Sequence, residues 1–356
     1  MLLRVPQGNS ISRSARGHGS SLVREARELV IDLPHPWYNR DVSSAQPTAG
    51  TIPSQAAPSN WFTDALSIAR YHIMLIAMVA MVTFGWLMTG KYLVALTAVV
   101  AVDWFLINLL NRVTDIDEDL HNAIPGTERV ARRKRALTLG CFALMGVSFL
   151  VTHWIWPGLT PWRVAVQVIG LGYNYKIVPT LHGLSRFKEI YFFKNFGSSV
   201  IFILTCFVYP IAVDPSTRVM GWPGIVALAL FFVPFELTYE ILYDLRDIKG
   251  DRAEGVPTYP VVHGEHRARQ IIDGLLLMSS LVLVAALGAG YLGVREGLML
   301  AAPVTQVLFY RPRYRRGLTS PDCIWLTHLG TAQLLLFLAG TAVWLKLGLP
   351  ANIFLH

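Results

Sequence analysis

The stretch AVVAVDWFLINLLNRVTDIDED, residues 98–119, decides how this chain folds. Its first half is an almost uninterrupted apolar run, and its second half places four carboxylates within the nine residues that begin at Asn111. A surface loop accounts for one or two acids, but not for Asn111, Asp115 and Asp119 at a strict four-residue step. That step keeps side chains on one face of a helix. The stretch therefore predicts an apolar helix that carries a polar stripe at its end.

The composition indicates a membrane protein. Of 356 residues, 53% are hydrophobic and only 15% are charged, whereas a soluble domain usually carries about 25% charged residues. A spanning helix needs about 20 mostly apolar residues. Candidate spans, of which the fourth and eighth are short, are residues 71–90, 92–111, 137–156, 160–176, 194–213, 222–243, 271–292, 296–310 and 325–349. The predicted fold is all-α, a polytopic bundle of nine transmembrane helices.

Basic residues give the orientation of this bundle. Lys and Arg gather in the connections after the second, fourth, sixth and eighth spans and are sparse on the other side. Because cytoplasmic loops carry the excess of Lys and Arg, the N-terminus is predicted to be cytoplasmic. The formal net charge of +8 then reflects topology and affinity for anionic headgroups or diphosphates. Nucleic-acid binding explains it poorly, because the basic residues are dispersed along membrane ends.

The N-terminal part differs from the rest in composition. Residues 1–60 are rich in Ser, Gly, Pro and Arg, which predicts a disordered cytoplasmic extension. Within it, Ser21–Leu33 is a candidate interfacial helix. Residues 61–356 are expected to form the membrane domain. The three cysteines are isolated along the chain, so they indicate neither a disulfide framework nor a metal site.

A second acidic stripe follows the sixth span, in FELTYEILYDLRDIKGD, residues 235–251. At about 100° per residue, its five acids fall within a sector of about 80°: Glu236, Glu240, Asp244, Asp247 and Asp251. Like charges on one helix face repel each other, so such a stripe needs a cation or a basic partner. Mg²⁺ prefers oxygen ligands and typically takes one or two carboxylates plus substrate phosphates. Two acidic stripes at the same membrane side therefore predict a site that holds two Mg²⁺ against a diphosphate.

Other charged residues near these stripes are expected to have different roles. Asp117 and Glu118 are expected to face away from the first stripe and to be solvated. Asp103 lies deeper in its helix, and a structural role is expected for it, because an intramembrane carboxylate usually faces the bundle interior. The segment YNYKIVPTLHGLSRFKEIYFFKNFG, residues 173–197, supplies cations for a diphosphate. Of these, Lys188 and Lys194 are the preferred candidates.

The two acidic motifs together resemble those of the UbiA superfamily of intramembrane prenyltransferases. NRVTDIDED reads N-x-x-x-D-x-x-x-D, and YDLRDIKGDRAEGVPTYPVVHG reads D-x-x-D-x-x-x-D-R-x-x-G. The resemblance covers residues 65–349. It implies Mg²⁺-dependent transfer of a prenyl group from a prenyl diphosphate to an aromatic or otherwise lipophilic acceptor. Neither the acceptor nor the oligomeric state follows from these motifs.

The resemblance also implies roles for individual residues. The residues expected to hold Mg²⁺ are Asn111, Asp115, Asp119, Asp244, Asp247 and Asp251. Of these, catalysis is expected to depend most on Asp115, Asp119, Asp247 and Asp251. The residues expected to bind the diphosphate are Lys188, Lys194, Arg186, Arg129 and Tyr175. Arg129, with Arg132 as the alternative, enters this set because the run after the first motif, LHNAIPGTERVARRKRAL, departs from the Arg-Pro-rich pattern of the family.

Alternative functions stay open at this point. A terpene cyclase on the same scaffold would use the same acids and quench the cation internally. A secondary transporter would place its acids near the membrane midplane, whereas here they cluster at helix ends. A phospholipid-headgroup transferase fits the four-residue step poorly. The expected setting is a bacterial inner (plasma) membrane, with the active site facing the cytoplasm.

Overall fold

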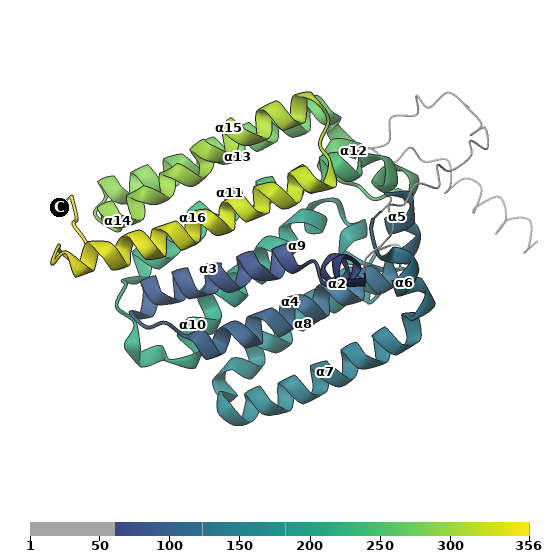
Figure 1. Ribbon diagram of the computed structural model, residues 1–356, viewed down its shortest axis with the longest axis horizontal. Coiled ribbons are helices and arrows are strands. Elements are labelled where there is room, and N and C mark those ends of the chain that lie inside the picture. Colours follow the sequence, from purple (N-terminus) through teal and green to yellow (C-terminus); the bar gives the residue numbers. More distant parts are fainter. Residues whose placement is uncertain (1–60, 123, 182, 356) are drawn as a thin grey trace, which may run out of the picture. The chain divides into compact units, whose positions relative to one another are not determined.

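The computed structural model describes residues 61–122, 124–181 and 183–355, and Figure 1 shows its helices. These residues belong to the unit that spans residues 54–356, and the other unit, residues 1–53, lies outside them. The expected disordered extension and the candidate interfacial helix Ser21–Leu33 therefore fall outside the described residues.

Seven helices of the described part are long and apolar enough to cross a membrane. They are α3 (Tyr71–Thr89), α4 (Val94–Thr114), α7 (Lys134–Ile155), the stretch Phe193–Val213, α11 (Trp222–Ala253), α13 (Glu265–Gly288) and α16 (Ser320–Lys346). The stretch Phe193–Val213 joins most of α9 (Tyr191–Ile203) to a π-helical turn, η3 (Leu204–Val208), and to α10 (Tyr209–Val213). The predicted class, an all-α polytopic bundle, is confirmed.

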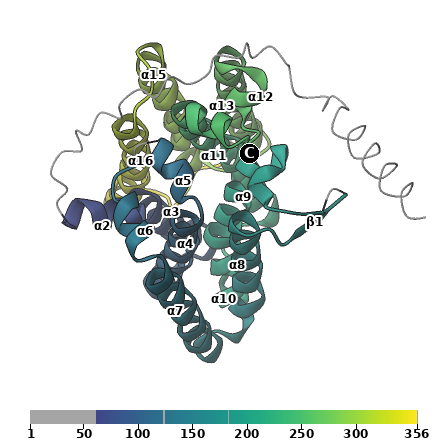
Figure 2. The same cartoon turned by 90° about the vertical axis from the view of Figure 1, so that its right-hand side faces the viewer.

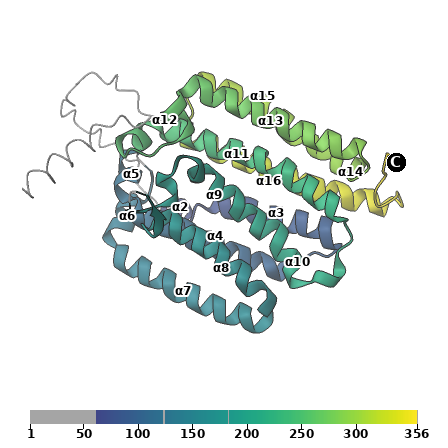
Figure 3. The ribbon, with the colours of Figure 1, turned by 180° about the vertical axis from the view of Figure 1, so that it is seen from behind.

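Two further helices occupy the places of the fourth and eighth predicted spans. They are α8 (Thr160–Asn174) and α15 (Ala301–Arg315), each of 15 residues. At 1.5 Å per residue such a helix is about 22 Å long, shorter than the hydrocarbon core of about 30 Å. Both lie alongside the longer helices in Figure 1 and, from behind, in Figure 3.

The ends of the long helices follow from local sequence. α3 stops at Gly90, whose φ of 70° directs its N–H to the carbonyl of Trp86, because glycine adopts the left-handed conformation at little cost. α16 starts after Thr319, whose hydroxyl oxygen accepts from the backbone N–H of Asp322 while the Asp322 carboxylate reaches back. This reciprocal cap satisfies backbone donors that the first turn leaves unpaired.

Short elements connect the helices at their two ends. One end, at the right in Figure 1, carries α5 (Ile116–His121), α6 (Thr127–Arg132) and α12 (Tyr259–His263), and we call it the acidic end. The other short elements are α2 (Trp61–Ala69), η1 (Pro157–Leu159), β1 (Val178–Thr180), β2 (Gly183–Ser185), η2 (Phe187–Glu189), η4 (Pro215–Thr217), α14 (Val294–Gly297) and η5 (Leu298–Leu300). β1 and β2 form an antiparallel hairpin, which projects from the helices in Figure 2.

The helices close into a ring. α3 packs on α4, α4 on α8, α8 on α9, α9 on α11, α11 on α16, and α16 returns to α3. α7 lies outside this ring against α4 and α8, while α13 and α15 lie outside it near α11 and α16. Figure 2, which views the acidic end, shows these helices end-on. The ring brings the ends of α4 and α11 to one edge, although they are far apart in sequence.

A fully buried polar cluster fastens α4 to α8 and α10. Asp103 accepts from Arg163, with Nε at 3.0 Å and Nη2 at 2.5 Å, from Gln167 at 3.0 Å and from the Tyr209 hydroxyl at 2.9 Å. Both members of the ion pair have an exposed fraction of 0%. Four donors on one carboxylate fix three helices together, in agreement with the structural role expected for Asp103.

The outer surface of α7 is apolar. Leu139, Val147, Leu150 and Trp154 are all more than half exposed along it. Soluble monomers rarely expose a continuous apolar patch of this kind, but lipid covers one without cost. This surface and the apolar helices indicate an integral membrane protein.

Candidate active site

The first acidic motif lies where α4 gives way to α5. Asp115 stands between the two helices with φ −105° and ψ 33°. The i→i−4 pattern nevertheless continues, because the Asp115 N–H donates to the Asn111 carbonyl and the Asp119 N–H to the Asp115 carbonyl, both at 2.9 Å. The Asn111 amide also donates to the Asp115 carboxylate. All three side chains are buried, so the predicted stripe survives the break between the helices.

Cations from the segment before α9 converge on Asp115. Lys188 Nζ lies 2.8 Å from Asp115 Oδ1, and Arg186 Nη1 lies 3.2 Å from the same oxygen. Lys188 Nζ also lies 2.6 Å from Glu118 Oε2. The side chain of Glu118 is only 20% exposed, so the expectation that it is solvated is wrong. The break at Asp115 rotates α5 and brings Glu118 onto the side that Lys188 occupies.

The cations around Asp115 do not fully offset the cost of burying its carboxylate. Burial raises its pKa above the ordinary value, the Lys188 ammonium opposes that rise, and the nearby Glu118 carboxylate adds to it. The net direction is upward although two cationic side chains contact the group. A further cation beside Asp115 would therefore be stabilising.

Asp119 has a partner of its own. It accepts from Arg112 Nη1 at 2.8 Å, and both side chains are buried. Nη2 of Arg112 continues to the backbone carbonyl of Ser67, at 3.1 Å. This chain of contacts ties the end of α2 to the first acidic motif.

The second motif faces a polar stripe on α9. Lys194 Nζ lies 2.5 Å from Asp244 Oδ1 and 3.4 Å from Asp251 Oδ2. Asn195 donates to the other oxygen of Asp244 at 2.6 Å. One turn further along, the hydroxyls of Ser198 and Ser199 donate to Glu236, from Ser198 at 2.8 Å. The predicted acidic stripe on α11 is therefore matched, turn by turn, by a complementary stripe on α9.

In the second motif, one acid has an oxygen without a hydrogen-bond partner, and another pairs with its neighbour in sequence. Asp251 Oδ1 is buried and has no hydrogen-bond partner among the described residues. Asp247 pairs with its neighbour Arg246, whose guanidinium lies 4.8 Å from the ring centroid of Tyr243. Asp244 and Asp251 thus share one ammonium group, which leaves this cluster with excess negative charge.

The two motifs meet across the acidic end. α5 packs on α11, and the side chain of Asn122 occupies the space where a Cβ on Gly250 would project. A Cβ at position 250, immediately before Asp251, would force the Asn122 side chain to move. Glu118 is near enough to Asp251 and to Tyr173 for its charge to act on both. The structure thus assembles acids from α4, α5 and α11 into one region.

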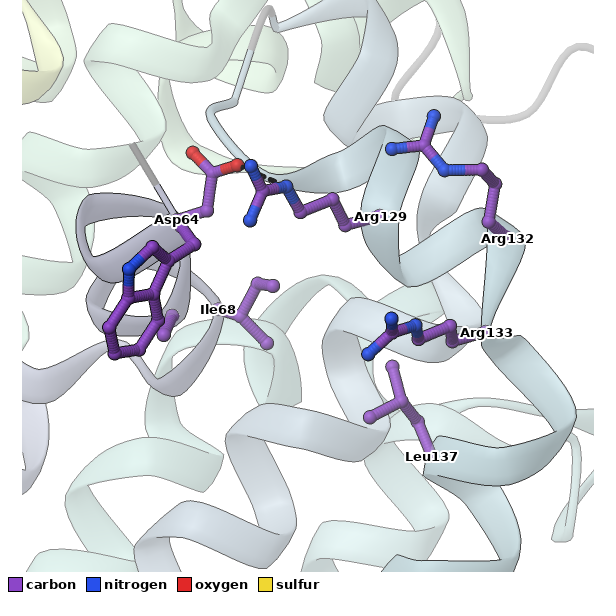
Figure 4. A pocket seen from close by; sticks show the side chains of 8 residues that line it. Asp64, Ile68, Arg129, Arg132, Arg133 and Leu137 are labelled. Atoms are coloured by element: carbon purple, nitrogen blue, oxygen red, sulfur yellow. Dashed lines mark ion pairs between the residues drawn. The ribbon is translucent and has the colours of Figure 1, made fainter. Parts of the chain in front are cut away.

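Two of the predicted diphosphate-binding residues lie elsewhere. Arg129 Nε lies 2.7 Å from Asp64 of α2, at a pocket of about 590 Å³ that Arg132 and Arg133 also line. Figure 4 shows the side chain of Arg129 pointing toward Asp64. Tyr175 packs on the apolar cluster around Leu106 and Leu110.

An apolar cavity begins beside the second motif. It has a volume of about 90 Å³. Its walls come from α3, α9, α11, α15 and α16, and include Ile73, Phe202, Phe235, Glu240, Tyr243 and Leu334. Tyr239 lines it as well. The cavity therefore joins a carboxylate-rich end to an apolar interior.

The carboxylate oxygens of the two motifs suit a hard cation whose remaining ligands come from a bound phosphate and water. Among the described residues, no three acidic, His or Cys side chains converge closely enough to hold a metal ion unaided. Mg²⁺ typically takes one or two carboxylates and completes its shell with substrate phosphates and water. The unpaired Oδ1 of Asp251 supplies a buried oxygen donor for this purpose. The residues present therefore fit Mg²⁺ held jointly with a phosphorylated ligand.

Comparison with known proteins identifies the family. The model of the UbiA prenyltransferase family matches residues 72–322. The chain belongs to the UbiA prenyltransferase family. The resemblance that the two acidic motifs carry is thereby confirmed.

Solved structures support the fold of this UbiA-family chain. It is similar to a UbiA homologue from Archaeoglobus fulgidus bound to GPP and Mg²⁺, with a TM-score of 0.59 and 18% identity over 78% of this chain and 99% of the homologue. It is also similar to the apo structure of a UbiA homologue from Aeropyrum pernix K1, with a TM-score of 0.52 and 14% identity over 77% of this chain and 98% of that chain.

A curated relative is similar over a shorter stretch. It is the digeranylgeranylglyceryl phosphate synthase of Haloquadratum walsbyi, which is 27% identical over 112 residues. These residues are 32% of this chain and 38% of the relative. The match therefore spans well under half of either protein.

Proposed function

We propose that this chain transfers a prenyl group from a prenyl diphosphate to an aromatic or otherwise lipophilic acceptor, in a Mg²⁺-dependent reaction at the acidic end. The observation that carries the proposal is the buried pairing of Lys188 with Asp115 and of Lys194 with Asp244 and Asp251. Two acidic motifs and two buried ammonium groups lie in one region, beside an apolar cavity. The homologue bound to GPP and Mg²⁺ has the same fold.

Magnesium would be held by oxygen donors of both motifs. The proposed donors are Asn111, Asp115, Asp119, Asp244, Asp247 and Asp251. Bound Mg²⁺ would neutralise the negative charge that grows on the departing diphosphate, which is often the largest contribution to catalysis in a dry site. Pairing with Lys188 and Lys194 keeps these carboxylates oriented before the substrate arrives.

The cations have a role of their own toward the diphosphate. Lys188 and Lys194 act as point charges, and Arg186 offers a fork of N–H donors. Arg129 and Tyr175 would belong to an outer part of the binding site, because Arg129 pairs with Asp64 and Tyr175 packs on the apolar cluster around Leu106. Preorganised donors of this kind stabilise the leaving group without reorganising during the reaction.

The prenyl chain is assigned to the apolar cavity. Its volume of about 90 Å³ is smaller than the cavity of about 150 Å³ that holds benzene in an engineered protein. Binding is therefore expected to displace apolar side chains such as Phe235 and Leu334. Tyr239 and Tyr243 line this cavity, and aromatic rings can stabilise a developing allylic cation.

The orientation in the membrane follows from the basic residues. We propose nine membrane-inserted helices, a cytoplasmic N-terminus and a bacterial inner membrane as the setting. Arg112, Arg133, Lys188 and Arg252 lie near the acidic end, whereas Lys91 and Arg295 lie near the opposite end. Cytoplasmic ends carry the excess of Lys and Arg, so the active site would face the cytoplasm.

The test is a transfer assay with purified protein in lipid nanodiscs. Radiolabelled prenyl diphosphates of several lengths are offered with a panel of acceptors, with Mg²⁺ or with EDTA. The proposal predicts a labelled, extractable product that needs Mg²⁺ and an acceptor. Release of a hydrocarbon or terpenol without an acceptor would instead indicate a cyclase.

A further inference from the structure

The larger pocket of the acidic end lies between α2 and the junction of α6 with α7. Its volume is about 590 Å³, and Figure 4 shows the side chains that line it. Pockets that hold small organic ligands have volumes of about 300–1,000 Å³. Prenyl transfer as proposed above involves Arg129 alone among the lining residues. The pocket therefore has room for a ligand that the reaction does not account for.

Close packing holds the two walls of this pocket together. The Ser67 hydroxyl of α2 donates to the Pro125 carbonyl at 2.9 Å. Gly126, at the start of α6, has φ 87°, and a Cβ there would lie 3.1 Å from Ile68 Cγ1 and 3.3 Å from the Asp64 carbonyl oxygen. Glycine suits this position because it adopts positive φ at little cost and lets α2 approach. The shape of the pocket is thus set by the fold itself.

The pocket carries more positive than negative charge. Its lining holds three arginines, and Asp64 is the one acid among the described residues there. Arg129 pairs with Asp64 at 2.7 Å. Arg132 lies 3.6 Å from Glu128, and both side chains are more than half exposed, so this pair contributes little. Within the described ranges, Arg133 has no ion-pair partner. Two guanidinium groups are therefore available to an anion.

The rest of the lining is apolar. It includes Trp61 and Ile68 of α2 and Leu137 of α7. Leu144 follows Leu137 by two helical turns on the same face of α7, and it is 38% exposed. The apolar lining thus continues onto the outer surface of α7. Trp61 is 70% exposed, and Trp is enriched where a membrane meets water. A ligand with an anionic head and an apolar tail would match both parts of the pocket.

The depth of the pocket in a membrane supports the same kind of ligand. α7 has 22 residues, so it is about 33 Å long, close to the hydrocarbon thickness of about 30 Å. Its first turn therefore lies near the boundary with the headgroups. Five basic residues fall between positions 129 and 135, directly before and within this turn. Basic clusters and pockets at such helix ends bind anionic headgroups.

We propose that this pocket binds the headgroup of an anionic phospholipid from the surrounding membrane. Arg132 and Arg133 donate charge-assisted hydrogen bonds to its phosphate, and its acyl chains lie along Leu137 and the outer surface of α7. Arg129 stays with Asp64 and holds α2 as the opposite wall. A free phosphate offers the same oxygen acceptors but leaves the apolar lining without a partner. The inference goes beyond prenyl transfer and does not depend on it.

The experiment measures lipid binding to the full-length protein in a neutral detergent by microscale thermophoresis. The probes are dioctanoyl phosphatidylglycerol and dioctanoyl phosphatidylcholine, which share the phosphate and the acyl chains and differ in net charge. Inorganic phosphate is added as a competitor to test whether a soluble anion occupies the same site. All titrations contain EDTA, which removes Mg²⁺-dependent binding at the acidic motifs.

Two matched double variants separate the pocket from general surface charge. Arg132→Gln with Arg133→Gln removes the two available guanidinium groups. Lys134→Gln with Arg135→Gln removes the same charge from the next two residues, neither of which lines the pocket. All four side chains are exposed, so both variants should fold. Their melting temperatures are measured alongside.

The inference predicts that wild type binds phosphatidylglycerol about tenfold or more tightly than phosphatidylcholine. The pocket variant should lose about tenfold or more in phosphatidylglycerol affinity, and the neighbouring variant less than about threefold. Inorganic phosphate at the concentration of the lipid should not displace it. Equal affinities for the two lipids, or equal losses from the two double variants, would overturn the site. Displacement of the lipid by an equal concentration of inorganic phosphate would show that the pocket takes a soluble anion, and would overturn the proposed phospholipid.

Discussion

Two buried charged clusters of this molecule are built in opposite ways. Around Asp103, one carboxylate receives four hydrogen bonds from Arg163, Gln167 and Tyr209. Around Lys194, two carboxylates share one ammonium group, and Asp251 Oδ1 has no partner among the described residues. The first cluster is complete and the second is not. A complete cluster suits a permanent clamp between helices, whereas an incomplete one suits a site that a ligand finishes.

The largest effect on stability is expected from a substitution in the cluster around Asp103. Asp103→Leu leaves the Arg163 guanidinium buried without a counter-charge, which should destabilise the fold by about 3–5 kcal/mol. We expect a large fall in melting temperature in detergent and poor yield. The fraction that remains folded should bind prenyl thiodiphosphate normally. A stable variant with impaired binding would mean that Asp103 belongs to the active site.

In the cluster around Lys194, we expect the opposite result, a large loss of activity with little loss of stability. Asp251→Asn removes a proposed Mg²⁺ ligand, and transfer should fall about a hundredfold or more. The melting temperature should hardly change, because Lys194 keeps Asp244 as its partner at 2.5 Å. Asp214→Asn serves as a control, since Asp214 pairs with Lys91 at the opposite end of the helices. Unimpaired transfer by the Asp251 variant at saturating substrate would remove this residue from the mechanism.

The shared ammonium group provides a smaller effect. Lys194→Met leaves Asp244 and Asp251 without their common cation and removes one donor to the diphosphate. The affinity for prenyl thiodiphosphate should fall about tenfold, the usual magnitude for a hydrogen bond to a charged group. The surface pair offers a matched control, because Lys91→Met should leave the affinity unchanged. Equal titration curves for the two variants would contradict the role of Lys194.

The smallest expected difference separates two arginines. Arg186 contacts Asp115 at 3.2 Å, whereas Arg129 contacts Asp64 at 2.7 Å. Arg186→Gln should weaken prenyl thiodiphosphate binding a few-fold, and Arg129→Gln by less than twofold. Both are measured by the same titration. A larger loss from the Arg129 variant would show that the diphosphate site extends toward α2.

Much of this arrangement could be predicted from sequence, because helical spacing is a strong signal. The four-residue steps in NRVTDIDED and the acidic stripe that begins at Glu236 placed the acids on helix faces, and the buried partners of Asp115 and Asp244 agree with those faces. The polar stripe of α9 could have been found as well. Lys194, Asn195, Ser198 and Ser199 recur at helical spacing in an apolar segment.

Other features depend on contacts that spacing does not encode. The backbone at Asp115 departs from helical angles, and this turns Glu118 toward Lys188. The pairing of Arg129 with Asp64 joins helices that sequence order alone does not place together. The left-handed backbone of Arg70, between α2 and α3, has no sequence signature either, since Arg is not favoured in that conformation. The lengths of α8 and α15 were marginal in the sequence and are marginal in the structure.

The central claim is that acids of α4–α5 and α11 form one diphosphate site. It is tested most directly by a double-mutant cycle on Asp115→Asn and Asp251→Asn, with the dissociation constant of geranylgeranyl thiodiphosphate in saturating Mg²⁺ as the measured quantity. Residues that act as a unit are strongly non-additive. The account predicts that the double variant binds little worse than the weaker single variant. Losses that multiply independently would show that the two motifs serve separate sites.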